Sequence, residues 1–154
     1  MNALTSFVVG SDYLDDDFFD LAKFVHNRIE SGTDAIIATD EDGDVFYLNV
    51  AAERLTGYPI DQIRGRPVSL YLTIINERDR NQVDDPVTRC LLSNATVAFS
   101  KHDVLVSREG AEIPIGGCVT PIRRKDGRAI GVVLMLRDVT ATRLMLERIS
   151  YRAQ

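Results

Sequence analysis

The sequence has little of what marks a membrane or secreted protein. None of its apolar stretches approaches the roughly 18 residues that a membrane-spanning helix requires. Residues 1–10 carry no basic segment ahead of an apolar run, as a secretory signal would. The two cysteines, Cys90 and Cys118, lie far apart and form no C-x-x-C pair, so we expect reduced thiols. These absences predict a cytoplasmic protein without a membrane span in this chain.

The motifs of the common enzyme classes are also missing. The sequence contains no G-x-S-x-G nucleophile turn, no phosphate-binding P-loop and no H-E-x-x-H zinc motif. Its two histidines, His26 and His102, belong to different elements and have no acidic or cysteine partner at an informative spacing. We therefore assign no catalytic residue and expect that this chain is not itself an enzyme.

Two charged features suggest ligands but do not have the required pattern. An EF-hand calcium loop needs glycine at its sixth position, whereas Gly43 is fourth in the acidic loop 40–44, which predicts a hairpin turn and no metal site. The net charge is −5, and the basic residues are scattered except for the cluster Arg123-Arg124-Lys125. We therefore expect no nucleic-acid binding.

Hydrophobic periodicity divides the chain into four segments. We expect a flexible acidic lead-in over residues 1–16, an N-terminal amphipathic helix over 17–32, a domain over 33–140 and the start of a linker helix over 141–154. The N-terminal helix carries Phe18, Leu21 and Val25 on one stripe. That stripe packs either on its own domain or on a second copy of the chain, and the spacing allows both.

The domain segment reads as strands with a group of short helices between them. Apolar or alternating runs predict five strands, over 35–38, 45–48, 96–106, 112–122 and 129–136. Asn49 is a suitable N-cap for a short helix that Gly57 ends. Residues 58–95 hold further helical pieces, and Gly116-Gly117 marks a bulge or a close backbone approach. This order predicts an α+β fold, a five-stranded antiparallel sheet with short helices on one face.

Several motifs resemble those of PAS (sensory box) domains. Residues 49–58, Asn-Val-Ala-Ala-Glu-Arg-Leu-Thr-Gly-Tyr, resemble the PAS motif after the second strand, and Gly65-Arg66-Pro67 resembles the start of the next helix. The runs 109–115, 120–122, 126–128 and 130–132, with Asp138-Val139-Thr140, are similar to the last PAS hairpin and its exit. Together they cover residues 34–140 in the order and spacing of the family.

The resemblance implies a sensory input module of a bacterial signalling protein. The closing residues 149–154 look like the helix that leads into a GGDEF domain, which implies a missing C-terminal effector of the cyclic-di-GMP type, a diguanylate cyclase or phosphodiesterase. Two alternatives stay open. One is the input domain of a histidine kinase, and the other is a ligand-free protein-interaction scaffold.

The resemblance also bears on cofactors, and it disfavours flavin and heme. Where flavin-binding PAS domains place a reactive cysteine this chain has Val68, and where they place a glutamine it has Leu136. Heme-binding relatives present a histidine from the long helix before the third strand, whereas residues 81–94 contain none and leave Cys90 as the one soft ligand. The cofactor therefore stays unknown.

A helical excursion over one sheet face should leave an apolar hollow, which could bind a small molecule. The expected lining is Phe46, Tyr71, Leu91, Phe99, Val119 and Val133. The same side chains at these positions are also what an ordinary filled core would show.

The exit from the domain carries the remaining candidates. The resemblance assigns Asp138 and Thr140 as the residues that relay the signal from the last strand to the output helix. The Thr140 hydroxyl can cap that helix, and local capping alone is the simpler alternative. Further along, Leu146 and Ile149 have the spacing of a coiled-coil seam, so we expect a homodimer.

Overall fold

The computed structural model describes residues 34–153 and the side chains of residues 34–150. The predicted lead-in and N-terminal helix lie outside the described residues, as do the candidate dimer residues Phe18, Leu21 and Val25. Within the described part, no helix combines the length and the apolar character needed to cross a bilayer.

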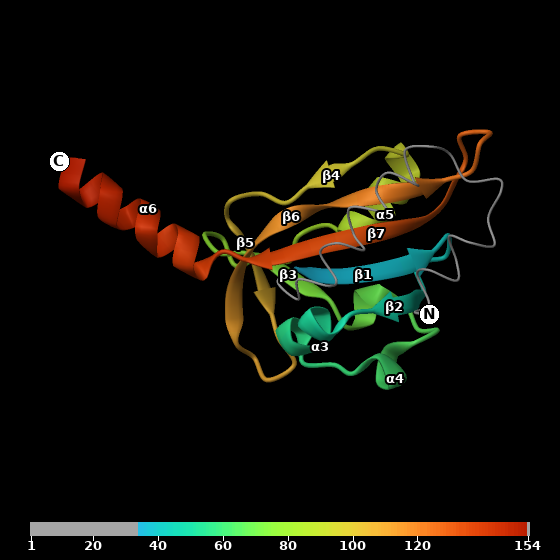
Figure 1. The fold of residues 1–154 in the computed structure, drawn as a ribbon, viewed down its shortest axis with the longest axis horizontal. Coiled ribbons are helices and arrows are strands. Elements are labelled where there is room, and N and C mark those ends of the chain that lie inside the picture. Colours follow the sequence, from blue (N-terminus) through green and yellow to red (C-terminus); the bar gives the residue numbers. More distant parts are fainter. Residues whose placement is uncertain (1–33, 154) are drawn as a thin grey trace.

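The described chain folds as one antiparallel sheet with short helices on one face (Figure 1). The elements are β1 (Ala35–Asp40), β2 (Val45–Leu48), α3 (Val50–Thr56), α4 (Ile60–Ile63), the 3-10 helix η1 (Val68–Leu70), β3 (Thr73–Asn76), α5 (Pro86–Ser93), β4 (Val97–Ala98), β5 (Asp103–Val106), β6 (Glu112–Arg123), β7 (Ala129–Asp138) and α6 (Thr140–Ala153). The strand order is β2-β1-β7-β6-β5-β3, and β4 pairs separately with β6. The predicted α+β class with an antiparallel sheet is confirmed.

The strand count differs from the predicted five. The run 96–106 forms two strands, β4 and β5, because a turn at residues 101–102 interrupts it, yet both strands pair with β6. A further strand, β3, lies within the segment expected to be helical and pairs with β5. Its four residues, Thr-Ile-Ile-Asn, are β-branched at three positions, which suits a strand, but the run is too short to stand out between helical pieces.

Asn49 connects the first hairpin to helix α3, as its N-cap position predicted. Its side-chain oxygen accepts hydrogen bonds from the backbone N–H groups of Ala52 (2.9 Å) and Ile36 (3.0 Å). Its amide nitrogen donates to the carbonyl oxygen of Asp34 (2.9 Å). Gly57 ends the helix in the left-handed conformation, with φ of 85°. The buried Asn49 side chain therefore fixes α3 against the start of β1.

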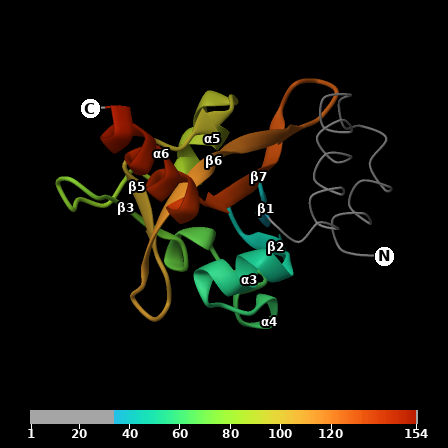
Figure 2. The ribbon, with the colours of Figure 1, turned by 60° about the vertical axis from the view of Figure 1, so that its left-hand side comes forward.

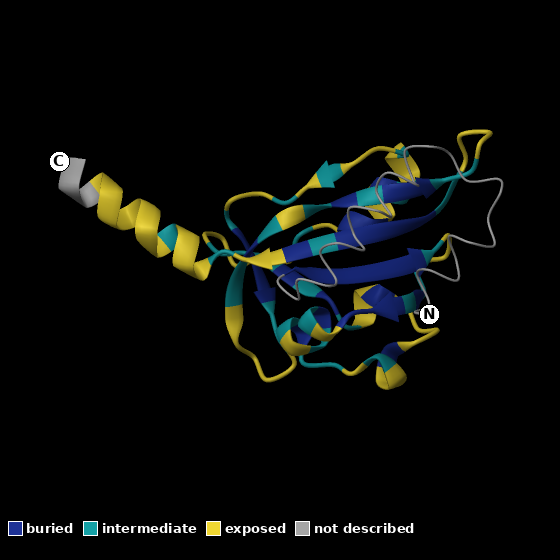
Figure 3. Cartoon of the chain, viewed as in Figure 1, coloured by how far each residue is buried: buried dark blue, intermediate teal, exposed yellow. Residues whose placement is uncertain are grey.

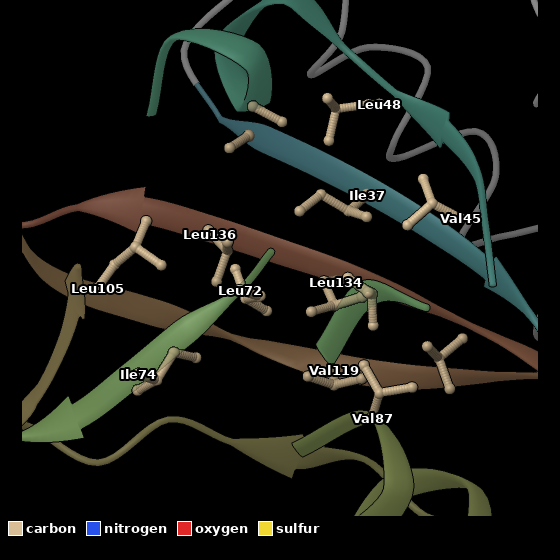
Figure 4. Close-up of a cluster of buried hydrophobic side chains, with 14 of the residues drawn as sticks. Ile37, Val45, Leu48, Leu72, Ile74, Val87, Leu105, Val119, Leu134 and Leu136 are labelled. Carbon is tan, nitrogen blue, oxygen red and sulfur yellow. The ribbon is translucent and has the colours of Figure 1, made fainter. Parts of the chain in front are cut away.

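The core lies between the sheet and the helices and follows strand alternation (Figures 3 and 4). Along β7, Val132, Leu134 and Leu136 face the helices, and along β1 Ala35 and Ile37 do so. The intervening side chains are also buried, among them Ile36 and Val133, so β1 and β7 are covered on both faces. The nearly continuous apolar run over 129–136 had predicted such a central strand.

Gly117 marks a close backbone approach, one of the two readings of Gly116-Gly117. A Cβ atom at residue 117 would lie 1.9 Å from the carbonyl oxygen of Met135 on the neighbouring strand β7. Residue 117 also has a backbone φ of +121°, which residues with a Cβ atom rarely adopt. The register shift of this hairpin lies elsewhere, between Ile122 and Arg123.

Candidate functional site: a rim groove and the output junction

Four of the six expected lining residues meet in the interior. Val119 is fully buried in the core cluster, and Tyr71, Leu91 and Phe99 are partly buried and pack against that cluster. Tyr71 directs its hydroxyl toward Arg66, whose guanidinium donates to it over 3.3 Å, so this end of the side chain faces outward. These four residues contribute to the packing between sheet and helices.

Phe46 and Val133 do not join that cluster, which corrects the expected lining. Val133 lies between Val132 and Leu134 on β7, and strand alternation therefore turns its side chain to the opposite face of the sheet. In the pairing of β1 with β2, Ala38 lies opposite Tyr47 and Thr39 opposite Val45, so the register shift places Phe46 at a bulge. A bulge changes the alternation that the sequence pattern assumes.

The interior also shows how the positions considered for cofactors are occupied. Val68 and Leu136 are buried apolar side chains of the core cluster. The Cys90 thiol is fully buried and contacts the carbonyl oxygen of Val119 at 3.7 Å. Burial raises the pKa of Cys90 to about 11, so the thiol stays protonated at neutral pH.

A groove of about 320 Å³ lies at the rim of the domain, outside the expected hollow. It is bounded by the start of β1, helix α3, the start of β6 and the end of β7. Its lining is Ala35, Ala51, Arg54, Leu55, Ile113, Leu136 and Asp138. None of the six residues predicted to line a pocket is among them. The groove therefore lies beside the junction between β7 and α6, and Asp138 belongs to both.

The junction itself is built on the Asp138 carboxylate. One carboxylate oxygen accepts hydrogen bonds from the backbone N–H of Thr140 (2.9 Å) and from its hydroxyl (2.6 Å). Thr140 is thus the donor, and the expected cap through its hydroxyl oxygen is replaced by a cap through Asp138. The backbone N–H of Val139 donates to the carbonyl oxygen of Pro114 on β6 (3.0 Å). A negative charge at the start of α6 also suits the helix dipole.

An ion pair that the sequence did not reveal holds the first turn of α6. The Arg143 guanidinium donates to both carboxylate oxygens of Glu77, over 3.1 Å and 2.8 Å. The ring nitrogen Nδ1 of His102 lies 3.3 Å from the same carboxylate. Hydrogen bonds from Arg143 first, and then from His102, lower the pKa of Glu77 below its ordinary value. Three segments, the loop after β3, the turn before β5 and helix α6, meet at this carboxylate, which we call the Glu77 clamp.

A second ion pair fastens the end of β7 to the start of β1. The Arg137 guanidinium contacts the two carboxylate oxygens of the buried Asp34 over 3.2 Å and 3.3 Å. This pairing raises the pKa of Arg137 above its ordinary value. The last residues of the central strand are therefore held by charged groups rather than by apolar burial.

Helix α6 extends away from the body of the domain (Figure 1), and in Figure 2 it is turned toward the viewer. It carries the candidate dimer residues Leu146 and Ile149, which are 60% and 58% exposed. Leu144 and Met145 are also exposed beside them. Four large apolar side chains on one exposed helix form a surface without a partner in the described chain.

Comparison with known proteins places this geometry in a family. A family model described as PAS fold matches residues 23–139. The probable diguanylate cyclase DgcE of Escherichia coli K12 is 27% identical over 140 residues, covering 91% of this chain and 12% of that protein. The signal transduction histidine-protein kinase AtoS of the same organism is 33% identical over 116 residues, covering 73% and 17%. The chain thus spans less than a fifth of either relative.

Solved structures agree on the fold. The PAS domain of a protein from Colwellia psychrerythraea has a TM-score of 0.59 at 21% identity, covering 79% of this chain and 98% of that one. The PAS domain of the fruit-fly ELK potassium channel has a TM-score of 0.57 at 14% identity, covering 78% and 97%. With the family model matching most of its residues, this chain belongs to the PAS fold family.

Proposed function

We propose that this domain is the sensory and dimerisation input module of a bacterial signalling protein, and that its signal leaves through Asp138-Val139-Thr140. One observation carries the proposal. The central strand β7 ends at Asp138 and helix α6 begins at Thr140, so a single residue separates them. A shift of β7 relative to its neighbours must therefore move the start of the helix.

The contacts at the junction favour transmission over free movement. The Asp138 cap fixes the helix start to β7, the Val139 N–H fixes it to β6, and the Glu77 clamp fixes its first turn to the loop after β3. Because these contacts come from different strands, a change in their relative positions changes the direction of α6.

The exposed apolar side chains of α6 support a homodimer. Leu146 and Ile149 lie one turn apart, and pairing them with a second copy would bury surface that is otherwise in water. Two effectors that follow such paired helices would stand side by side, and a change in helix direction would alter their alignment.

For the effector we propose a GGDEF-type cyclic-di-GMP enzyme, because the match to the probable diguanylate cyclase DgcE covers 91% of this chain. A histidine kinase is the second candidate, supported by the 33% identity to AtoS. The two differ in product, since one makes a cyclic dinucleotide and the other a phosphorylated histidine.

The test uses the intact signalling protein with Asp138→Ala and Glu77→Gln, and with Arg148→Gln as a matched control on an exposed part of α6. Cyclic-di-GMP synthesis and autophosphorylation are both measured. We expect each junction variant to change the effector output by about two- to fivefold while circular dichroism stays unchanged, because the loss of one partly exposed ion pair or cap corresponds to about 0.5–1 kcal/mol. Unchanged output in both variants contradicts the relay. Sedimentation that shows a strict monomer contradicts the dimer.

A further inference from the structure

Two charged side chains face the rim groove and are not neutralised. The Arg54 guanidinium makes no hydrogen bond or ion pair with any residue of the described chain. Asp138 uses one carboxylate oxygen for Thr140, and its other oxygen has no partner among residues 34–153. No ion pair joins the two groups within residues 34–153, although both line the same groove.

The remainder of the groove is apolar. Leu136 is fully buried, Ala35 is nearly so, and Leu55 and Ile113 are half-buried. Small side chains at Ala35 and Ala51 leave the space open, and its volume lies at the lower end of the roughly 300–1,000 Å³ that small-molecule sites occupy. An apolar surface with one cationic and one anionic side chain suits a small zwitterionic ligand.

We propose that this groove binds a small zwitterion with an apolar body, the chemistry of a free apolar α-amino acid. The ligand carboxylate accepts hydrogen bonds from the Arg54 guanidinium, whose planar fork suits two oxygens. The ligand ammonium donates to the free oxygen of Asp138. The ligand side chain lies on the partly exposed Ala51, Leu55 and Ile113.

Charge complementarity favours a zwitterion over molecules that carry only one of the two charges. A simple carboxylic acid satisfies Arg54 but places its apolar end against the Asp138 carboxylate. A simple amine satisfies Asp138 but leaves Arg54 without a partner. Both side chains are exposed to water in the described structure, and only a molecule with both charges gains a charge-assisted hydrogen bond from each of them.

This inference rests on the proposed function at one point, the shared Asp138. When the ligand ammonium binds one oxygen, the carboxylate is held between the ligand and Thr140. Ligand binding then favours the arrangement in which the start of α6 is capped, and the capped arrangement favours ligand binding by the same factor. The groove and the output helix would be coupled through one side chain.

The test is an NMR titration of the 154-residue chain with L-leucine and two matched analogues. 3-Methylbutylamine lacks the carboxylate, and 4-methylpentanoate lacks the ammonium. We expect L-leucine to shift the backbone amide signals of Leu136 and Thr140. We expect both analogues to bind at least about tenfold more weakly, the loss that corresponds to one charge-assisted contact. Equal binding of all three compounds, or no binding of any, overturns the proposal.

Variants separate this proposal from the relay. Arg54→Gln should weaken L-leucine binding at least about tenfold, and Ala51→Leu should abolish it by filling the groove. Arg64→Gln, at an exposed arginine outside the groove, is the control and should bind as the unchanged chain does. Binding that survives both Arg54→Gln and Ala51→Leu overturns the site.

If L-leucine binds but leaves the output of the intact protein unchanged, the site stands and the proposed function fails. If Glu77→Gln alters output while L-leucine does not bind, the proposed function stands and the ligand site fails.

Discussion

The two ends of β7 are held in opposite ways. From Gly131 to Leu136 the strand lies between β1 and β6, and most of its side chains are fully buried. At Arg137 and Asp138 the side chains are exposed, and the chain continues into a helix held by ion pairs and one cap. Figure 3 shows this change along a single strand, from buried to exposed.

The energies of the two kinds of contact differ. Burying one leucine side chain contributes about 1.5–3 kcal/mol, whereas a partly exposed ion pair contributes about 0–1 kcal/mol. The exit can therefore rearrange at a cost far below that of unfolding the sheet. A domain that must pass on a signal without unfolding needs this difference between its centre and its exit.

The largest effect should come from the buried part of β7. Leu134→Ala removes a fully buried side chain from the core cluster, and we expect the free energy of unfolding to fall by about 2–5 kcal/mol. Because the chain has no tryptophan, urea denaturation is followed by circular dichroism. Leu92→Ala, at a side chain 84% exposed on α5, is the control and should change stability by less than about 0.5 kcal/mol. Equal losses of unfolding free energy in the two variants would contradict the expected difference between the buried part of β7 and an exposed side chain.

A smaller loss of unfolding free energy is expected between β2 and α3, where the polar residue Asn49 is buried. Asn49→Ala removes the N-cap of α3 and leaves the Ile36 N–H and the Asp34 carbonyl without their partner. We expect a loss of about 1–3 kcal/mol in unfolding free energy. Asn81→Ala, at an exposed asparagine, should be close to neutral in the same measurement. A neutral Asn49→Ala would show that water replaces all three hydrogen bonds.

At the exit we expect local rather than global change. Glu77→Gln weakens the hold on Arg143, and the unfolding free energy should fall by less than about 1 kcal/mol. Hydrogen exchange of the α6 amides should nevertheless become several-fold faster, because the helix loses its main attachment. Arg148→Gln on the same helix should leave exchange unchanged. A global loss as large as that of Leu134→Ala would place the clamp in the core instead.

The smallest effect is the pH dependence of the clamp. Arg143 and His102 lower the pKa of Glu77 in the folded chain, whereas the unfolded chain has the ordinary value of 4.5. The stabilisation by Glu77 is therefore complete above about pH 4.5 and is lost as the pH falls through the lowered folded pKa. Exchange of the α6 amides should rise over that range. The step should be absent in Glu77→Gln, and its persistence there would assign it to another carboxyl group.

Several local features were predictable because their signals are close together in the chain. Asn49 and Gly57 bound α3 as expected, since a cap needs only a side chain or a free φ angle within one turn of the helix end. The two hairpin turns and the central position of β7 followed in the same way. Membership in the PAS family was indicated by several motifs that occur in the order and spacing of the family.

The clamp and the groove were not predictable in this way. Glu77 and Arg143 are 66 positions apart, and nothing in either neighbourhood indicates the other. The groove lining comes from four separate elements, and Phe46 was misplaced because a bulge interrupts the alternation of β2.

The sequence by itself determined the two ends of α3, which strand is central and that a helix follows β7, but not β3 or the division of the run 96–106. Those choices depend on dihedral preferences, caps and apolar periodicity, which act over a few residues. Only the tertiary structure decided that Asp138 caps α6 and lines a groove, and that Glu77 holds Arg143. Such contacts depend on strand register and packing, because these alone bring distant side chains within hydrogen-bond distance.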